Sequence, residues 1–90
     1  MEFEWNEEKA ASNLSKHGVS FDEAKTIFDD PLYVDFYDPD HSYEEHRYIM
    51  IGKSQQGRLL LVSYTERGNA IRLISARAVT RTEREAYEEG

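Results

Sequence analysis

Basic side chains are concentrated in the second half of this chain, where they could bind phosphate. Between Lys53 and Arg81 there are six basic residues and one acidic residue, whereas the first 45 residues carry three Lys against thirteen Asp and Glu. Guanidinium groups bind phosphate and carboxylate oxygens in pairs, so this distribution favours an anion-binding face on a molecule whose net charge is −7. A solvated strand face with local ion pairs explains the same charges equally well.

Two of these arginines are expected to face each other across adjacent strands. A four-residue connection at 66–69 sets a register in which Arg77 lies opposite Arg58 and Arg72 lies opposite Ser63. Facing cations repel unless an anion or an acid lies between them, which predicts a phosphate clamp on Arg58 and Arg77. Ion pairs with acidic residues are the structural alternative. Three further charged residues fall at the ends of the same strands: Glu66, Arg67 and Arg81.

Strand alternation divides the arginines of the last predicted strand between two faces. Side chains alternate along a strand, so Arg72 points to one face while Ser75 and Arg77 point to the other. These residues cannot share one flat face. We therefore expect at least one of them to be structural.

His17 closes a predicted helix that also carries Lys9 and Lys16. A histidine at a helix C-terminus is stabilised in its charged form, which suits a general acid. A simple helix cap is the structural alternative. The seven-residue spacing of the two lysines places them about two turns apart on one face, so this helix is expected to present a basic edge.

The sequence predicts neither a metal nor a cofactor. There is no cysteine, hence no thiolate nucleophile and no Cys-ligated zinc. His41 and His46 lie in an acidic segment that resembles a ligand cluster, but their spacing does not fit H-E-x-x-H, and a Pro-containing acidic loop is the simpler interpretation. The Gly-rich phosphate-binding motifs and the G-x-S-x-G motif are also missing.

The order of predicted elements indicates an α+β fold. Apolar alternation predicts strands at 1–5, 32–37, 47–53, 58–65 and 71–79. The capping residues Asn6, Ser20 and Thr80, together with apolar spacing, predict helices at 7–17, 21–29 and 81–88. We expect N-terminal helices packed on a four- to five-stranded, mainly antiparallel sheet, followed by a short C-terminal helix. One face of such a sheet stays open and can carry function.

Length and composition limit the class of protein. The 90 residues fit one domain, 1–90, with a single small core. No apolar run approaches the ~18 to 20 residues that a membrane span requires, and the first residues lack a secretory pattern. We expect a cytoplasmic protein with no membrane partner.

Several motifs in this chain resemble the BrnT toxins. The resemblance rests on F-E-W-N-E-E-K-A at 3–10, K-H-G-V-S-F at 16–21, F-D-D-P at 28–31, Y-T-E-R-G-N-A-I-R-L-I-S-A-R at 64–77 and T-R-T-E-R-E-A-Y at 80–87. It implies a RelE-like fold and a toxin of a type II toxin–antitoxin system, namely a metal-independent RNA endonuclease that inhibits translation. It also implies neutralisation by a BrnA-like ribbon-helix-helix antitoxin, through which alone the toxin reaches operator DNA.

The resemblance also assigns roles to residues on these motifs. Metal-free RNA cleavage needs a base, an acid and cations at the phosphate. Arg72 and Arg77 become candidate phosphate binders, Glu66 or His17 the base, and His17 or Lys9 the acid. Arg67 joins this catalytic group, and Arg58 and Arg81 are the candidate substrate-binding residues.

The acidity of the chain supports a second hypothesis. A net charge of −7 is a poor balance for an RNA-cleaving protein but suits one whose main partner is a basic antitoxin. The alternative function is therefore a catalytically weak antitoxin-binding module that acts mainly as a transcriptional corepressor.

Overall fold

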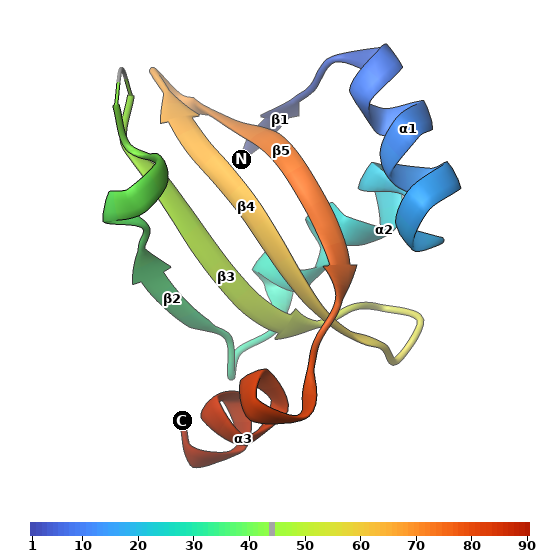
Figure 1. The fold of residues 1–90 in the computed structure, drawn as a ribbon, viewed down its shortest axis with the longest axis vertical. Helices are drawn as coiled ribbons and strands as arrows, with labels where there is room; N and C mark the ends of the chain where they lie inside the picture. The colour runs from blue at the N-terminus through green and yellow to red at the C-terminus, as the bar shows by residue number, and fades with distance from the viewer. Residues whose placement is uncertain (44) are drawn as a thin grey trace.

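A five-stranded sheet organises the chain in the computed structural model, which describes residues 1–43 and 45–90. The strands lie in the order β1-β5-β4-β3-β2, with β1 parallel to β5 and every other pair antiparallel (Figure 1). The strands are β1 (Glu2–Glu4), β2 (Val34–Tyr37), β3 (Arg47–Lys53), β4 (Leu59–Arg67) and β5 (Ala70–Ala78). The expected α+β fold is confirmed, with β1 at one edge of the sheet and β2 at the other.

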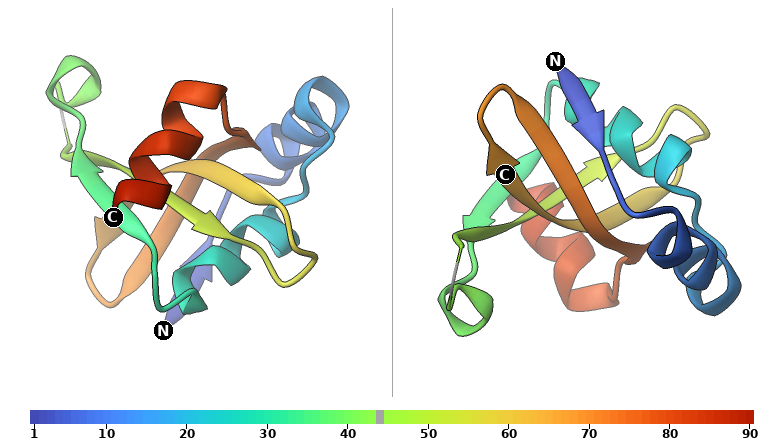
Figure 2. Two further views of the ribbon diagram at one scale, coloured as in Figure 1. Left: turned by 90° about the horizontal axis from the view of Figure 1, so that it is seen from below. Right: turned by 90° about the horizontal axis from the view of Figure 1, so that it is seen from above.

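Helices lie on both sides of this sheet (Figure 2). The helical elements are α1 (Glu7–His17), α2 (Phe21–Ala24), η1 (Lys25–Asp29), η2 (Pro39–His41) and α3 (Arg81–Glu89). The single helix expected at 21–29 is α-helical only in its first turn and continues as a 3₁₀ segment. Among the helices that the structure describes, none has the length and apolarity needed to cross a membrane.

Local capping explains where the helices begin. The side chains of Asn6 and Ser20 accept hydrogen bonds from the backbone N–H groups of Lys9 and Glu23, at 3.0 Å each. Gly18 ends α1 in the left-handed conformation, with φ +67°. These residues therefore set the start of α1 and of α2 and the end of α1.

The hydrophobic core fills the space between the sheet and the α2–η1 segment. Its fully buried members include Phe21, Ile27, Leu60, Val62 and Leu73. A side chain at Gly52 would place Cβ 3.0 Å from the Ile27 Cβ atom and 3.1 Å from its carbonyl oxygen. A glycine at this position therefore lets η1 lie directly against β3.

Asn13 joins α1 to the edge of β5 beyond the end of β1. Its amide nitrogen donates to the carbonyl oxygens of Ala76 (2.8 Å) and Val19 (2.9 Å), and its amide oxygen accepts from the Ala76 N–H (3.0 Å). The buried side chain thus pairs with β5 as a neighbouring strand would. This fixes the basic edge of α1 against the last strand.

Candidate active site

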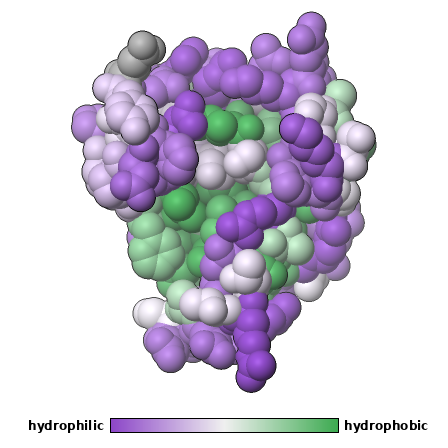
Figure 3. Space-filling view, in the orientation of Figure 1, coloured by the Kyte–Doolittle hydropathy of each residue, from purple (hydrophilic) through white to green (hydrophobic). Residues whose placement is uncertain are grey.

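A groove lies on the sheet face opposite α2 and η1, between the η2 loop and α3. Its floor comes from the three central strands, and the face shows an apolar area between polar borders (Figure 3). The groove has a volume of about 330 Å³. The residues that line it are Asp38, His41, Arg47, Ile49, Leu61, Ser63, Ile74, Ser75, Arg77 and Glu83.

A β-bulge decides which side chains reach this groove. Ser63 pairs with Ser75, but the next residue of β4, Tyr64, pairs with Leu73, so Ile74 is an extra residue in β5. The extra residue shifts the alternation by one position. Arg72 consequently points to the same face as Ser75 and Arg77.

The bulge and a tight turn give β4 and β5 a register that differs from the predicted one. Arg72 lies opposite Thr65 rather than Ser63, and Arg77 lies opposite Leu61 rather than Arg58. The prediction that Arg72 and Arg77 occupy opposite faces is also wrong. The strands extend to Arg67 and start again at Ala70, so the connection contains only two residues, with Gly68 at φ +58°.

Arg77 is held at the groove by a carboxylate of α3. Its two terminal nitrogens donate to the two oxygens of Glu83, at 2.8 Å each. Glu83 also accepts from the Thr80 N–H at 2.8 Å and closes a capping box at the start of α3. The hydrogen bonds from Arg77 lower the pKa of Glu83 to about 2, so the pair is ionised at neutral pH. Arg77 is therefore fixed in direction while 38% of its side chain stays exposed.

Arg47, which sequence reasoning did not single out, is the second arginine of the groove. It lies opposite Thr65 at the start of β3 and is half-buried. Within residues 1–43 and 45–90, no carboxylate lies at salt-bridge distance from its guanidinium group. The alternation of Arg47, Ile49 and Ile51 along β3 could have predicted its orientation, because it places Arg47 on the same face of the sheet as Ile49.

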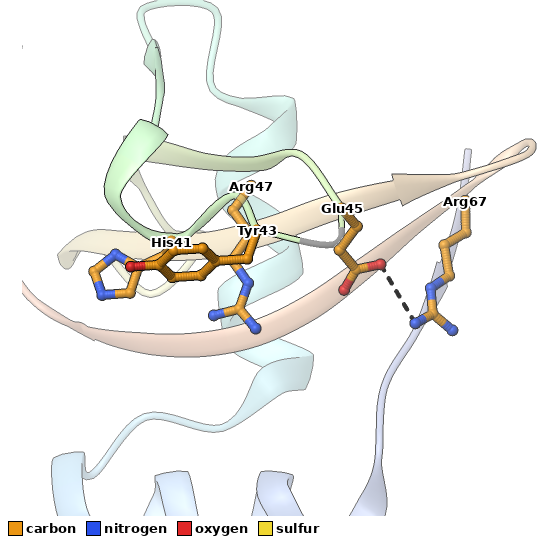
Figure 4. Close-up of a pocket in the computed structure, with 5 residues that line it drawn as sticks. All are labelled: His41, Tyr43, Glu45, Arg47 and Arg67. Carbon is orange, nitrogen blue, oxygen red and sulfur yellow. Dashed lines mark hydrogen bonds and ion pairs between the residues drawn. The ribbon is translucent and has the colours of Figure 1, made fainter.

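A second pocket adjoins the groove near the hairpin end of the sheet. His41, Tyr43 and Arg47 lie on one side of it, and Glu45 and Arg67 lie on the other (Figure 4). Arg67 donates to Glu45 at 3.5 Å. The structure thus places Arg67 beside the groove, with a carboxylate partner of its own.

The basic edge of α1 meets the groove at the bulge. A small pocket between α1 and β5 is lined by Lys9, Ser12, Asn13, Lys16, His17, Ile74 and Ser75. Ile74 and Ser75 line this pocket and the groove alike. Lys9 and His17, the two candidates for the general acid, therefore line the same pocket, next to the face that carries Arg77.

Arg58 lies away from the groove and is bound to Glu23 of α2. Its Nε donates to a Glu23 carboxylate oxygen at 2.9 Å, one of its terminal nitrogens donates to the other oxygen, and the same terminal nitrogen also donates to the Gly18 carbonyl. Arg58 holds the pKa of the buried Glu23 below its usual range. The predicted facing pair of Arg58 and Arg77 does not exist, because the register places Arg77 opposite Leu61. Each of the two arginines instead binds its own carboxylate, Glu23 or Glu83.

The other predicted residues lie outside the groove lining. Arg72 approaches Glu4 at 3.9 Å, and Arg81 approaches Glu85 at 3.7 Å with 93% of its side chain exposed. Glu66 is exposed near the end of β4. Of the predicted site residues, Arg77, Lys9 and His17 line the groove or its basic edge, and Arg67 lines the pocket beside it.

The acidic loop contains a histidine–aspartate pair. The His41 Nδ1 atom lies 2.9 Å from an oxygen of Asp38, whereas the His46 Nδ1 atom lies 3.1 Å from the Tyr37 hydroxyl. Glu44, part of the same predicted acidic cluster, lies outside the described residues. In the part of the chain that is described, no three His, Asp or Glu side chains are grouped as metal ligands.

Comparison with known proteins gives the family. The chain matches the family profile of the ribonuclease toxin BrnT of type II toxin–antitoxin systems over residues 5–83. Its fold is similar to the 1.1 Å crystal structure of the Brucella abortus ribonuclease toxin BrnT, with a TM-score of 0.66, 23% identity, and coverage of 90% of this chain and 99% of that one. No curated protein sequence matches. The chain thus belongs to the BrnT family of ribonuclease toxins of type II toxin–antitoxin systems.

Proposed function

We propose that this toxin cleaves RNA without a metal ion and that the reaction takes place in the groove on the open face of the sheet. The observation that carries the proposal is the bulge at Ile74, which turns Ser75 and Arg77 toward Arg47 and joins their groove to the basic edge of α1. Arg47, Arg77 and the basic edge of α1 then border one strip of the sheet, the part of the groove floor around Ser75. A bound RNA backbone fits this arrangement of charge.

The groups along this strip match the needs of metal-free RNA cleavage. The 2′-oxygen attacks phosphorus, negative charge builds on the phosphoryl oxygens, and the 5′-oxygen leaves with a proton. Arg47 and Arg77 stabilise the charge, and His17 or Lys9 protonates the leaving oxygen. Arg72 shares the open face but does not line the groove, which gives it a weaker claim to the phosphate.

The net charge of the chain does not oppose this proposal, because the charges near the bulge differ from the average. The residues that line the pocket on α1 include Lys9, Lys16 and His17 and no carboxylate. In the groove itself, Glu83 and Asp38 each face a basic partner. The local field at this strip therefore favours an anion.

Purified, antitoxin-free protein is expected to cut single-stranded RNA equally well with EDTA and with Mg²⁺. The products should be a 2′,3′-cyclic phosphate and a 5′-hydroxyl, and a strand with deoxyribose at the cleavage site should stay intact, because the nucleophile is missing. The measurement is gel and mass analysis of end-labelled RNA. Loss of cleavage in EDTA would reveal a metal mechanism. RNA that stays uncut both alone and with ribosomes would leave the alternative function, a corepressor with weak catalytic activity.

A type II toxin has a cognate antitoxin, and we propose that here it is a basic, BrnA-like ribbon-helix-helix protein through which the toxin reaches operator DNA. The edge strand β2 is the surface that fits it. Leu32, Tyr33, Phe36 and Tyr37 are between 46% and 68% exposed along this edge, next to the acidic residues of the following loop. A basic segment can add a strand there and cover the apolar side chains.

Co-expression with the neighbouring gene product should yield a stable complex whose association rate falls with salt. Phe36→Glu is expected to weaken this complex by at least about tenfold, because it places a charge in the covered apolar surface. Leu14→Glu is the matched control, since Leu14 is similarly exposed (51%) but lies on α1. Surface plasmon resonance measures both. Equal binding by the two variants would place the antitoxin elsewhere.

A further inference from the structure

We infer that His41, oriented by Asp38, is the base that removes the 2′-hydroxyl proton in this groove. The inference rests on the proposed function and adds a base that neither His17 nor Glu66 supplies as well. His17 lies on the α1 side of the bulge, and Glu66 does not line the groove. His41 and Asp38 both do.

The geometry of the pair prepares the imidazole for proton transfer. An ionised carboxylate only accepts hydrogen bonds, so in the neutral imidazole the contact of 2.9 Å requires the proton on Nδ1, and the Nε2 lone pair is then available. The Asp38 side chain is 15% exposed and the His41 side chain is 64% exposed. The orienting group is thus held in the protein while the ring remains open to a ligand.

Hydrogen bonds fix the loop to the strand that carries Arg47. The Ser42 hydroxyl donates to the Asp38 carbonyl and accepts from the Arg47 N–H at 2.9 Å, and the Asp38 N–H donates to the Arg47 carbonyl at 2.9 Å. The base and one phosphate-binding arginine therefore share a short, bonded segment. Such preorganisation keeps reacting groups in position.

The charged groups around His41 suit a base that works beside a phosphate. In the groove it shares the lining with Asp38, Arg47, Arg77 and Glu83. On its other side the adjoining pocket contributes Tyr43, Glu45 and Arg67. Arg77 is paired with Glu83, and Arg67 with Glu45. Among the described residues of the two pockets, Asp38 is the carboxylate that contacts the imidazole.

The chemical step is balanced without any further reactant. Nε2 of His41 takes the 2′-hydroxyl proton as the 2′-oxygen bonds to phosphorus, and the P–O5′ bond breaks with its electron pair on the 5′-oxygen. A protonated group of the basic edge, His17 or Lys9, supplies the proton that completes the 5′-hydroxyl. Ser75 lines both the groove that contains His41 and the pocket that contains His17 and Lys9.

The test compares variants of His41 and Asp38 with a histidine control in the same part of the chain. His41→Ala and His41→Gln should each lower the cleavage rate by about 100-fold and remove the ascending acid limb of the pH–rate profile, since that limb reports the base. Added imidazole should restore activity to His41→Ala. Asp38→Asn should lose less, because the ring remains but its orientation is weakened. His46→Gln, whose ring bonds Tyr37 outside the groove, should cleave at the normal rate.

The results separate this inference from the proposed function. If the wild type and both His41 variants cleave RNA with the same rate and pH profile, His41 is not the base, while the ribonuclease proposal stands. Loss of activity that imidazole does not restore, together with a lower melting temperature, would assign the pair a structural role and overturn the inference. If the wild type leaves RNA uncut, the proposed function itself fails.

Discussion

Arg47→Ala is expected to reduce RNA cleavage by about 10²- to 10³-fold, which corresponds to about 2.7 to 4 kcal/mol of barrier, the scale of losing one transition-state donor. The guanidinium faces the groove, and the described residues place no carboxylate at salt-bridge distance from it. Its charge is therefore available to the phosphate. Because few interactions are lost in the free protein, the melting temperature should change little.

Single-turnover cleavage of labelled RNA and thermal unfolding by circular dichroism measure the two effects. Arg84→Ala, at an exposed position of α3, is the charge-matched control and should keep full activity. Arg77→Ala should lose comparable activity but also stability, because Glu83 then loses two donors. Full activity in Arg47→Ala would remove this arginine from the phosphate site.

Arg58→Ala is expected to lower the free energy of unfolding by about 2 to 3 kcal/mol and the melting temperature by roughly 10 to 20 °C. The Glu23 side chain is 3% exposed and would keep only the hydrogen bond from Ser54. Arg58 is 43% exposed, so solvent screening places the effect below that of a fully buried pair. Arg81→Ala, which removes a surface pair, should cost less than about 0.5 kcal/mol.

The same pair predicts the pH dependence of stability. Hydrogen bonds from Arg58 lower the pKa of Glu23 in the folded state, so the carboxylate contributes stability above its unfolded pKa and loses it as the pH falls. The stability difference between the wild type and Arg58→Ala should therefore shrink as the solution is acidified. Urea unfolding at several pH values measures it. A difference that stays constant from neutral to acid pH would show that charge plays no part.

Much of the fold could be predicted because its signals are local. Asn6, Ser20 and Thr80 are side chains that cap a helix within three residues, and the structure confirms each cap. The strands at 47–53 and 71–79 follow from alternation over short windows, and the structure places them within one residue of these bounds. The segment 21–29 differs because α2 continues as the 3₁₀ segment η1, and two strands have other bounds, since β2 begins at Val34 and β4 extends to Arg67.

The candidate site was harder to predict because it depends on register and on distant contacts. Ile74 gives no sign of a bulge, since a β-branched residue is typical of a regular strand. In a regular strand, Arg72 and Arg77 are five residues apart and therefore point to opposite faces of the sheet. The hydrogen bond between Arg58 and Glu23 spans 35 positions, and Arg47, as the first residue of a strand, carries no signal in the sequence that sets it apart. His41 lies in an acidic loop, and nothing in the sequence distinguishes a general base there from a metal ligand or a plain loop residue.

The most direct test of the proposed site is the position of bound RNA on the folded protein. Backbone amide shifts should be recorded by NMR while a short RNA analogue with deoxyribose at the cleavage site is added. We expect the largest shifts at the groove and its basic edge, at Arg47, Ser63, Ser75, Arg77 and His17. Shifts confined to the opposite face, around Trp5, Phe21 and Asp22, would contradict the assignment of the groove as the active site.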